Sequence, residues 1–113
     1  MESELTSKIE VLRQAFEDKL IERRATMAAG VEDISEAVDA ATREKALLNL
    51  ENIAHQISGS GAIFGHKELG IAAEALELAC RQSRDDPTSS KAAENLMTCW
   101  NGVVGLIDGD GTA

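Results

Sequence analysis

Apolar residues recur at intervals of three and four along almost the whole chain, which is the spacing of one face of an α-helix. In the first stretch this face carries Ile9, Leu12, Phe16, Leu20 and Met27. A second series follows, with Val31, Ile34, Ala37, Val38 and Ala41 on one side. Gly30 lies between the two series, and glycine is a poor helix residue, so we expect the helix to end or kink there. The pattern leaves open whether residues 7–41 form one kinked helix or two.

Three further helices are expected after this stretch. Thr42 is a candidate N-cap for a helix that runs to about Phe64, and Gly65 is a suitable C-terminal break. The next helix is expected from near His66 to about Ser83. A polar loop at residues 85–90 follows it, in which Asp86 is a candidate N-cap for the last helix, with Pro87 at the first helical position.

Each of these helices has an apolar face that is expected to point inward. The inward residues are Leu47, Leu50, Ala54, Ile57, Gly61 and Phe64, then Leu69, Ala72, Ala73, Leu76 and Ala79 or Cys80, and finally Ala92, Leu96, Trp100, Val103 and Ile107. No strand-like alternation persists, and the connections are short. We therefore predict an all-α, up-and-down antiparallel four-helix bundle, with an extra N-terminal helix if residues 7–41 are divided. Residues 1–113 are expected to form a single domain, with a frayed tail at about 108–113.

The composition and charge narrow the classes of partner. Hydrophobic residues make up 43% of the chain and charged residues 27%, which is typical of a globular domain. The net charge is −9, from 11 basic and 20 acidic residues, which argues against nucleic acid and anionic membrane surfaces as partners. We expect a monomer that binds neither.

The N-terminal sequence, the apolar runs and the cysteines fit a reducing compartment. The acidic start of the chain does not resemble a secretory signal, and no apolar run is long enough for a membrane span. Cys80 and Cys99 lie beside apolar positions without metal-site spacing, so both are expected to be buried free thiols. A cytoplasmic location fits these features.

His55 is the candidate reactive residue, because it points about 130° away from the middle of the apolar stripe of its helix. Its neighbours on the helix surface are nearly all small or polar: Glu51, Asn52, Ser58, Gly59 and Ala62. An imidazole nitrogen is a competent nucleophile toward phosphoryl groups at neutral pH. Phosphoryl transfer needs in-line approach and little steric bulk around the acceptor.

The residues one turn from His55 have expected roles that follow from spacing alone. Gly59 leaves a notch beside the ring, and Ser58 can donate a hydrogen bond on the other flank. Glu51 could orient the ring through its other nitrogen. Gly61 faces inward and is expected to let a neighbouring helix pack closely.

The run His55-Gln56-Ile57-Ser58-Gly59-Ser60, followed by Gly65, Leu69, Ala73, Leu76 and Glu77, resembles the signature of the histidine-containing phosphotransfer (HPt) domain. In that signature His is followed by any residue, Leu, Lys, Gly and Ser. A further Gly, a Leu and a Leu-Glu pair stand at the spacings seen here. Ile57 replaces the usual Leu conservatively, whereas Ser58 stands where the family usually has Lys. That Lys is thought to neutralise the phosphoryl group, so another cation, such as Lys67 or a partner residue, would have to substitute for it.

The resemblance implies a phosphorelay function. His55 would accept a phosphoryl group from the aspartate of a receiver domain, such as that of a hybrid histidine kinase, and pass it to another receiver. The divalent metal would belong to the receiver, so the chain is expected to carry no cofactor or metal and to have no autonomous catalytic activity. Docking is expected over the His55 helix and the adjacent helix, at Leu48, Asn52 and Lys67, with Ala62 at the rim.

Alternative functions have less support in the sequence. Gly59-Ser60-Gly61 lacks the strand and the Gly-Lys-Ser ending of a phosphate loop. No Glu-x-x-His pair suggests a di-metal bundle, and the tail lacks the ligands of a calcium loop. His66 is a less favoured acceptor, since no small residues clear its surroundings. The main alternative is a helical adaptor that docks on receivers or kinases without being phosphorylated.

Overall fold

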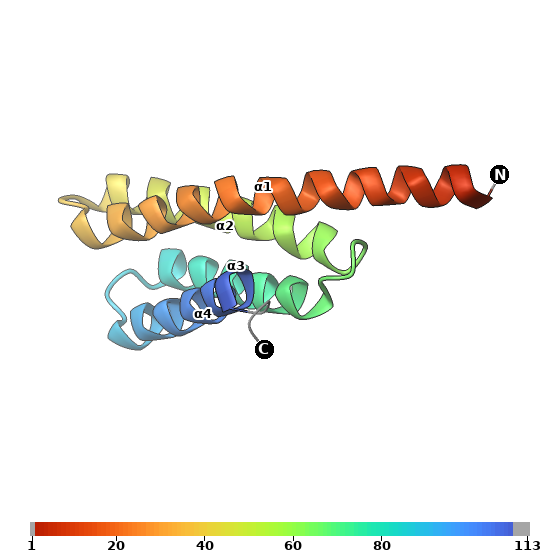
Figure 1. Cartoon of the computed structure of the whole chain (residues 1–113). Helices are drawn as coiled ribbons and strands as arrows, with labels where there is room; N and C mark the ends of the chain where they lie inside the picture. Colours follow the sequence, from red (N-terminus) through yellow and green to blue (C-terminus); the bar gives the residue numbers. More distant parts are fainter. Residues whose placement is uncertain (1, 110–113) are drawn as a thin grey trace.

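The computed structural model describes residues 2–109, which form four helices in a bundle (Figure 1). These are α1 (Glu2–Glu36), α2 (Ala40–Gly61), α3 (Lys67–Asp85) and α4 (Ser90–Gly109). Successive helices run in opposite directions, with α1 packed on α2, α2 on α3, and α3 on α4. The predicted all-α, up-and-down bundle is confirmed. None of the helices in this part of the chain combines the length and the apolar character that crossing a bilayer requires.

The core contains apolar side chains from all four helices. Its buried members are Phe16, Leu20, Met27, Val31, Leu47, Leu50, Ala54, Ile57, Leu69, Ala73, Leu76, Ala79, Cys80, Leu96, Trp100 and Val103. The faces predicted from periodicity are thus confirmed for α2, α3 and α4. They are wrong at the N-terminal end of α1, at Val38, which lies in the α1–α2 loop and is 93% exposed, and at Ala41, which is exposed in the first turn of α2.

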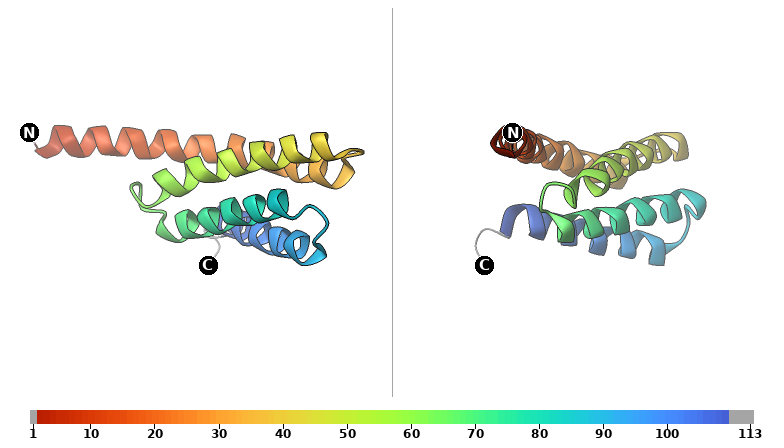
Figure 2. Two further views of the ribbon diagram at one scale, coloured as in Figure 1. Left: turned by 180° about the vertical axis from the view of Figure 1, so that it is seen from behind. Right: turned by 90° about the vertical axis from the view of Figure 1, so that its right-hand side faces the viewer.

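The N-terminal part of α1 extends beyond the other helices (Figure 2). This helix has 35 residues, whereas α2 to α4 have 22, 19 and 20. Ile9 and Leu12 are 49% and 56% exposed, and burial on this face begins at Phe16. The predicted helix end at Gly30 is wrong, because α1 continues through it to Glu36. This stretch is therefore one helix, and no extra N-terminal helix is present among the described residues.

The connecting segments begin and end at residues different from those predicted. Asp39, not Thr42, is the N-cap of α2, because its carboxylate accepts a hydrogen bond of 2.7 Å from the Thr42 backbone N–H. That bond lowers the pKa of Asp39, since it favours the charged form. Gly65 takes a positive φ of 85° in the α2–α3 turn, as expected for a glycine break.

The α3–α4 loop also differs from the prediction. The Asp86 backbone N–H closes the end of α3 by donating to the carbonyl of Gln82. The Ser89 hydroxyl, rather than Asp86, caps α4 by accepting from the Ala92 N–H at 3.0 Å. Pro87 therefore lies in the loop and not in the first turn of α4.

The start of the predicted frayed tail is helical. Asp108 lies in α4, and its carboxylate accepts hydrogen bonds of 2.7 and 2.6 Å from Arg24 of α1. These bonds lower the pKa of Asp108 and join the last helix to the first. The frayed-tail prediction is therefore wrong for 108 and 109, while residues 110–113 lie outside the described part of the chain.

Glycine at position 61 allows α2 and α3 to approach closely. A Cβ atom added to Gly61 would lie 2.9 Å from the His66 carbonyl oxygen and 3.1 Å from Cα of Gly70. Both neighbours are backbone and cannot simply rotate away. The expected packing role of Gly61 is confirmed, and the contact lies near the end of α2 that carries His55.

Replacing Gly61 and Gly59 of α2 by alanine should change the stability of the protein in opposite directions. Gly61→Ala should lower the free energy of unfolding by about 1–3 kcal/mol, because the new methyl group forces the two helix backbones apart. Gly59→Ala should raise it by about 0.5–1 kcal/mol, since a Cβ there meets nothing within 4 Å and alanine is the better helix former. Urea denaturation followed by circular dichroism measures both. A Gly61→Ala protein with the same free energy of unfolding as the wild type would contradict the close approach of the two helices.

The two cysteines differ in environment. Cys80 is fully buried in the core, and burial raises its thiol pKa to about 12. Cys99 is only half-buried, so the prediction that both thiols are buried holds for Cys80 alone.

Alkylation at pH ~8 should therefore label Cys99 in the folded protein and leave Cys80 unmodified, because the thiolate is the reactive form. Mass spectrometry after iodoacetamide treatment measures this, with the urea-unfolded protein as the control in which both thiols react. Equal labelling of Cys80 in the folded protein would contradict its burial.

Candidate functional site

His55 stands on the solvent-exposed face of α2. Its side chain is 71% exposed, whereas Ala54 and Ile57 on the core-facing side of the helix are fully buried. The apolar stripe therefore faces the core as predicted, and the imidazole projects into solvent. A large partner can reach this ring without any rearrangement of the bundle.

Glu77 of α3 holds one nitrogen of this ring. The His55 Nδ1 atom lies 2.9 Å from Oε2 of Glu77, whose side chain is only 13% exposed. A carboxylate at this distance favours the tautomer with the proton on Nδ1. The lone pair is then on Nε2, which has no hydrogen-bond partner among residues 2–109. The ring is thus oriented, and its nucleophilic nitrogen is free.

Glu51 does not have the orienting role expected from the sequence. It is 8% exposed, and its Oε2 atom accepts a hydrogen bond of 3.3 Å from Arg81. Arg84 Nε lies 3.3 Å from its Oε1 atom, as an ion pair without hydrogen-bond geometry. Helical spacing places Glu51 one turn from His55, but α3 covers that position and binds the Glu51 carboxylate through Arg81 and Arg84. Glu77 was part of the motif, and the antiparallel packing of α3 on α2 was the signal that could have identified its role.

The two small residues after His55 have different environments. Gly59 is exposed, and a Cβ atom there would meet nothing within 4 Å, so the backbone beside the ring is open. The Ser58 hydroxyl donates a hydrogen bond of 2.9 Å to the backbone carbonyl of His55. The backbone at Gly59 is therefore uncovered, while the Ser58 hydroxyl is bound within its own helix.

The residues expected to form the docking surface are exposed. Leu48 and Asn52 lie on the same face of α2 as His55, and Leu48 is 41% exposed. Ala62, the C-cap residue that follows α2, is also exposed. Lys67 is exposed at the start of α3. Two further apolar residues on α3, Ile71 and Leu78, are 61% and 46% exposed and were not predicted as part of this surface.

His66 is packed against side chains of α1 and is much less exposed than His55. Its Nε2 atom lies 2.8 Å from Oε2 of Glu17, and its ring centroid is 5.6 Å from that of Phe16. Its side chain is 24% exposed. The second histidine therefore fastens α1 to the turn between α2 and α3.

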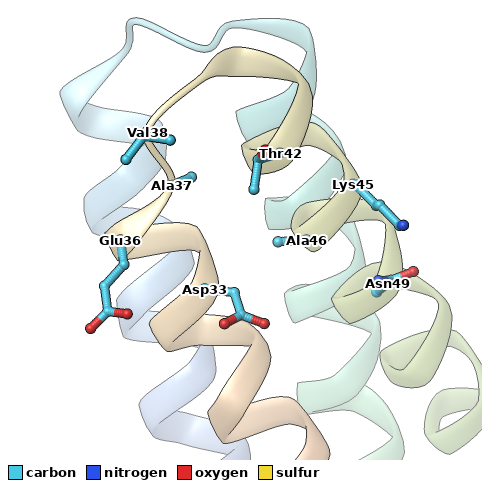
Figure 3. A pocket seen from close by; sticks show the side chains of 8 residues that line it. All are labelled: Asp33, Glu36, Ala37, Val38, Thr42, Lys45, Ala46 and Asn49. Carbon is cyan, nitrogen blue, oxygen red and sulfur yellow. The ribbon is translucent and has the colours of Figure 1, made fainter.

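A groove at the opposite end of α2 has no comparable chemistry. It lies between the end of α1 and the start of α2 (Figure 3). Its lining residues are Asp33, Glu36, Ala37, Val38, Thr42, Lys45, Ala46 and Asn49. Within residues 2–109, no group of three or more His, Cys, Asp or Glu side chains is arranged to hold a metal ion. The His55–Glu77 pair is therefore the candidate site.

Comparison with protein families gives a match to the model of the Hpt domain over residues 2–104. No match was found among curated proteins or among solved structures. The family match includes His55, Glu77 and the greater part of all four helices. Hpt domains are helical phosphotransfer modules of two-component signalling, and this chain belongs to that family.

Proposed function

We propose that the chain is a phosphorelay intermediate that accepts a phosphoryl group on Nε2 of His55 from a receiver-domain aspartate and passes it to another receiver. The observation that carries this proposal is the state of the ring. Its Nδ1 atom is held by Glu77 at 2.9 Å, and its Nε2 atom is exposed and unpartnered among the described residues. The chain then acts as a phosphocarrier, without catalysing a reaction of its own.

From this chain, the transfer step requires only the neutral imidazole of His55. The Nε2 lone pair forms a bond to phosphorus as the bond between phosphorus and the aspartyl oxygen breaks, and the aspartate leaves as a carboxylate. The imidazole ring keeps its Nδ1 proton and gains a positive charge. The Glu77 carboxylate stabilises that charge, so the proton need not move during the step. Donation to the next receiver is the same step in reverse.

The surface around His55 supports docking of a receiver. The open backbone at Gly59 leaves room for the phosphoryl group and the loops that carry it. Leu48 and Asn52 on α2, with Ala62 just after its end, supply a mixed apolar and polar surface. The partners are the receiver domains of response regulators and of a hybrid histidine kinase, and the divalent metal belongs to those receivers.

Phosphoryl acceptance tests the proposal directly. After incubation with a phosphorylated receiver and magnesium, the wild-type chain should carry acid-labile, alkali-stable phosphate. His55→Gln should abolish the label, because no nucleophile remains at that position. His66→Gln is the matched control and should keep it, since His66 is bound to Glu17.

Label that persists in His55→Gln would place the acceptor elsewhere. No label from any donor receiver, together with measurable binding to receivers, would favour the helical adaptor. The adaptor has one observation in its support, which is that Ser58 supplies no cation beside the ring.

Bulk at position 59 should block transfer. Gly59→Leu should reduce the rate of label uptake at least about tenfold, because the side chain fills the space that in-line approach requires. The matched control is Gly102→Leu, at an exposed glycine of α4 where an added Cβ also meets nothing within 4 Å. Both proteins should keep the helix content of the wild type by circular dichroism. Unchanged transfer in Gly59→Leu would contradict the role of the notch.

A further inference from the structure

We infer that Arg81 is a positioning residue for His55, which acts by holding Glu77 against the ring. This inference rests on the proposed function of His55 and adds a residue that touches neither the ring nor the phosphoryl group. The Arg81 Nη2 atom lies 3.4 Å from Oε2 of Glu77, the same oxygen that contacts His55 Nδ1. Arg81 is one turn beyond Glu77 on α3, and its side chain is 48% exposed.

Arg81 bridges two carboxylates that belong to different helices. Its Nη2 atom is also 3.3 Å from Oε2 of Glu51 on α2. Glu51 and Glu77 are thus both within hydrogen-bond distance of one guanidinium nitrogen, and both are poorly exposed, at 10% and 13% of their side chains. Two like charges this close repel each other, and the shared cation removes that repulsion.

The four charged residues form an alternating series that ends at the imidazole. Arg84 contacts Oε1 of Glu51, Arg81 joins Glu51 to Glu77, and Glu77 contacts the ring. Glu51 is the less free of the two acids, because it is buried and has a second cation. If Arg81 is removed, the Glu77 side chain is the one that can relieve the repulsion by turning toward solvent. The His55 Nδ1–H would then lose its acceptor.

The proton of the ring gives a readout that is independent of phosphotransfer. With Glu77 in place, the neutral ring carries its proton on Nδ1, and Nε2 has the lone pair that attacks phosphorus. If Glu77 turns away, the exposed His55 ring exchanges between both tautomers and rotates. Nitrogen-15 chemical shifts of the His55 ring, recorded at pH about 8.5 where an ordinary imidazole is neutral, distinguish the two states.

The experiment compares three variants of the full chain. Arg81→Gln should shift the His55 nitrogens from the Nδ1–H pattern toward the tautomer mixture and lower the rate of label uptake about tenfold or more. Arg81→Lys should retain part of the Nδ1–H pattern and part of the transfer rate, because it keeps a cation between the carboxylates. Arg84→Gln is the matched control: it removes the same charge from the same series without a contact to Glu77. It should leave the ring pattern of the wild type.

Backbone amide spectra of each variant check that the bundle is intact. A wild-type tautomer pattern in Arg81→Gln would overturn the inference, as would an equal shift in Arg84→Gln, because the effect would then be one of overall charge. If the ring pattern depends on Arg81 as expected but no receiver phosphorylates the wild-type chain, the phosphorelay proposal fails while the positioning of the ring by Arg81 stands. The ring spectra and the transfer assay therefore separate the two.

Discussion

The hydrogen bond between His55 and Glu77 is the interaction on which the site depends, and it exists only because α2 and α3 lie close together. His55 lies on α2 and Glu77 on α3, so the bond forms only when the two helices are packed together. The close approach is possible because Gly61 and Gly70 bring backbone against backbone at one end of the helix pair. Packing at this contact therefore determines whether the imidazole presents a fixed nitrogen or a freely rotating ring.

The same pair of helices separates two kinds of surface around the ring. On the side toward α3, Glu51 and Glu77 are nearly buried and are balanced by arginines, so the charges there are compensated. On the outer side, Gly59 leaves the backbone open. Water screens partly buried ion pairs less than fully exposed ones, so the contacts of Glu51 and Glu77 are stronger than they would be in open solvent. The site thus combines a charge-compensated inner half with an accessible outer half, which fits the proposed role of His55 as a phosphoryl acceptor.

The first helix has a supporting role. Phe16 packs against Phe64 at a centroid distance of 5.5 Å, and Glu17 binds His66, so α1 covers the turn that joins α2 and α3. Farther along α1, the Arg24 side chain donates a hydrogen bond to the Asp108 carboxylate of α4. These contacts attach α1 to the part of the bundle next to the site. The residues before Phe16 extend past the helices that could cover them, which explains why apolar side chains such as Ile9 remain exposed.

Much of this protein follows from the order of its residues. The three- and four-residue spacing of Leu50, Ala54 and Ile57 requires a buried face, and His55 lies outside that face whatever the helix packs against. The motif around His55 also indicated the family, because those spacings are local. The partner of His55 is different: Glu51 and Glu77 are equally plausible on local chemistry. The choice between them depends on which helix covers the ring, and helical periodicity carries no information about the neighbour. For the same reason the periodic stripe of α1 gave no sign that its first turns have nothing to pack on. Local spacing decides which side chains point the same way, and only the packing of the helices decides what those side chains meet.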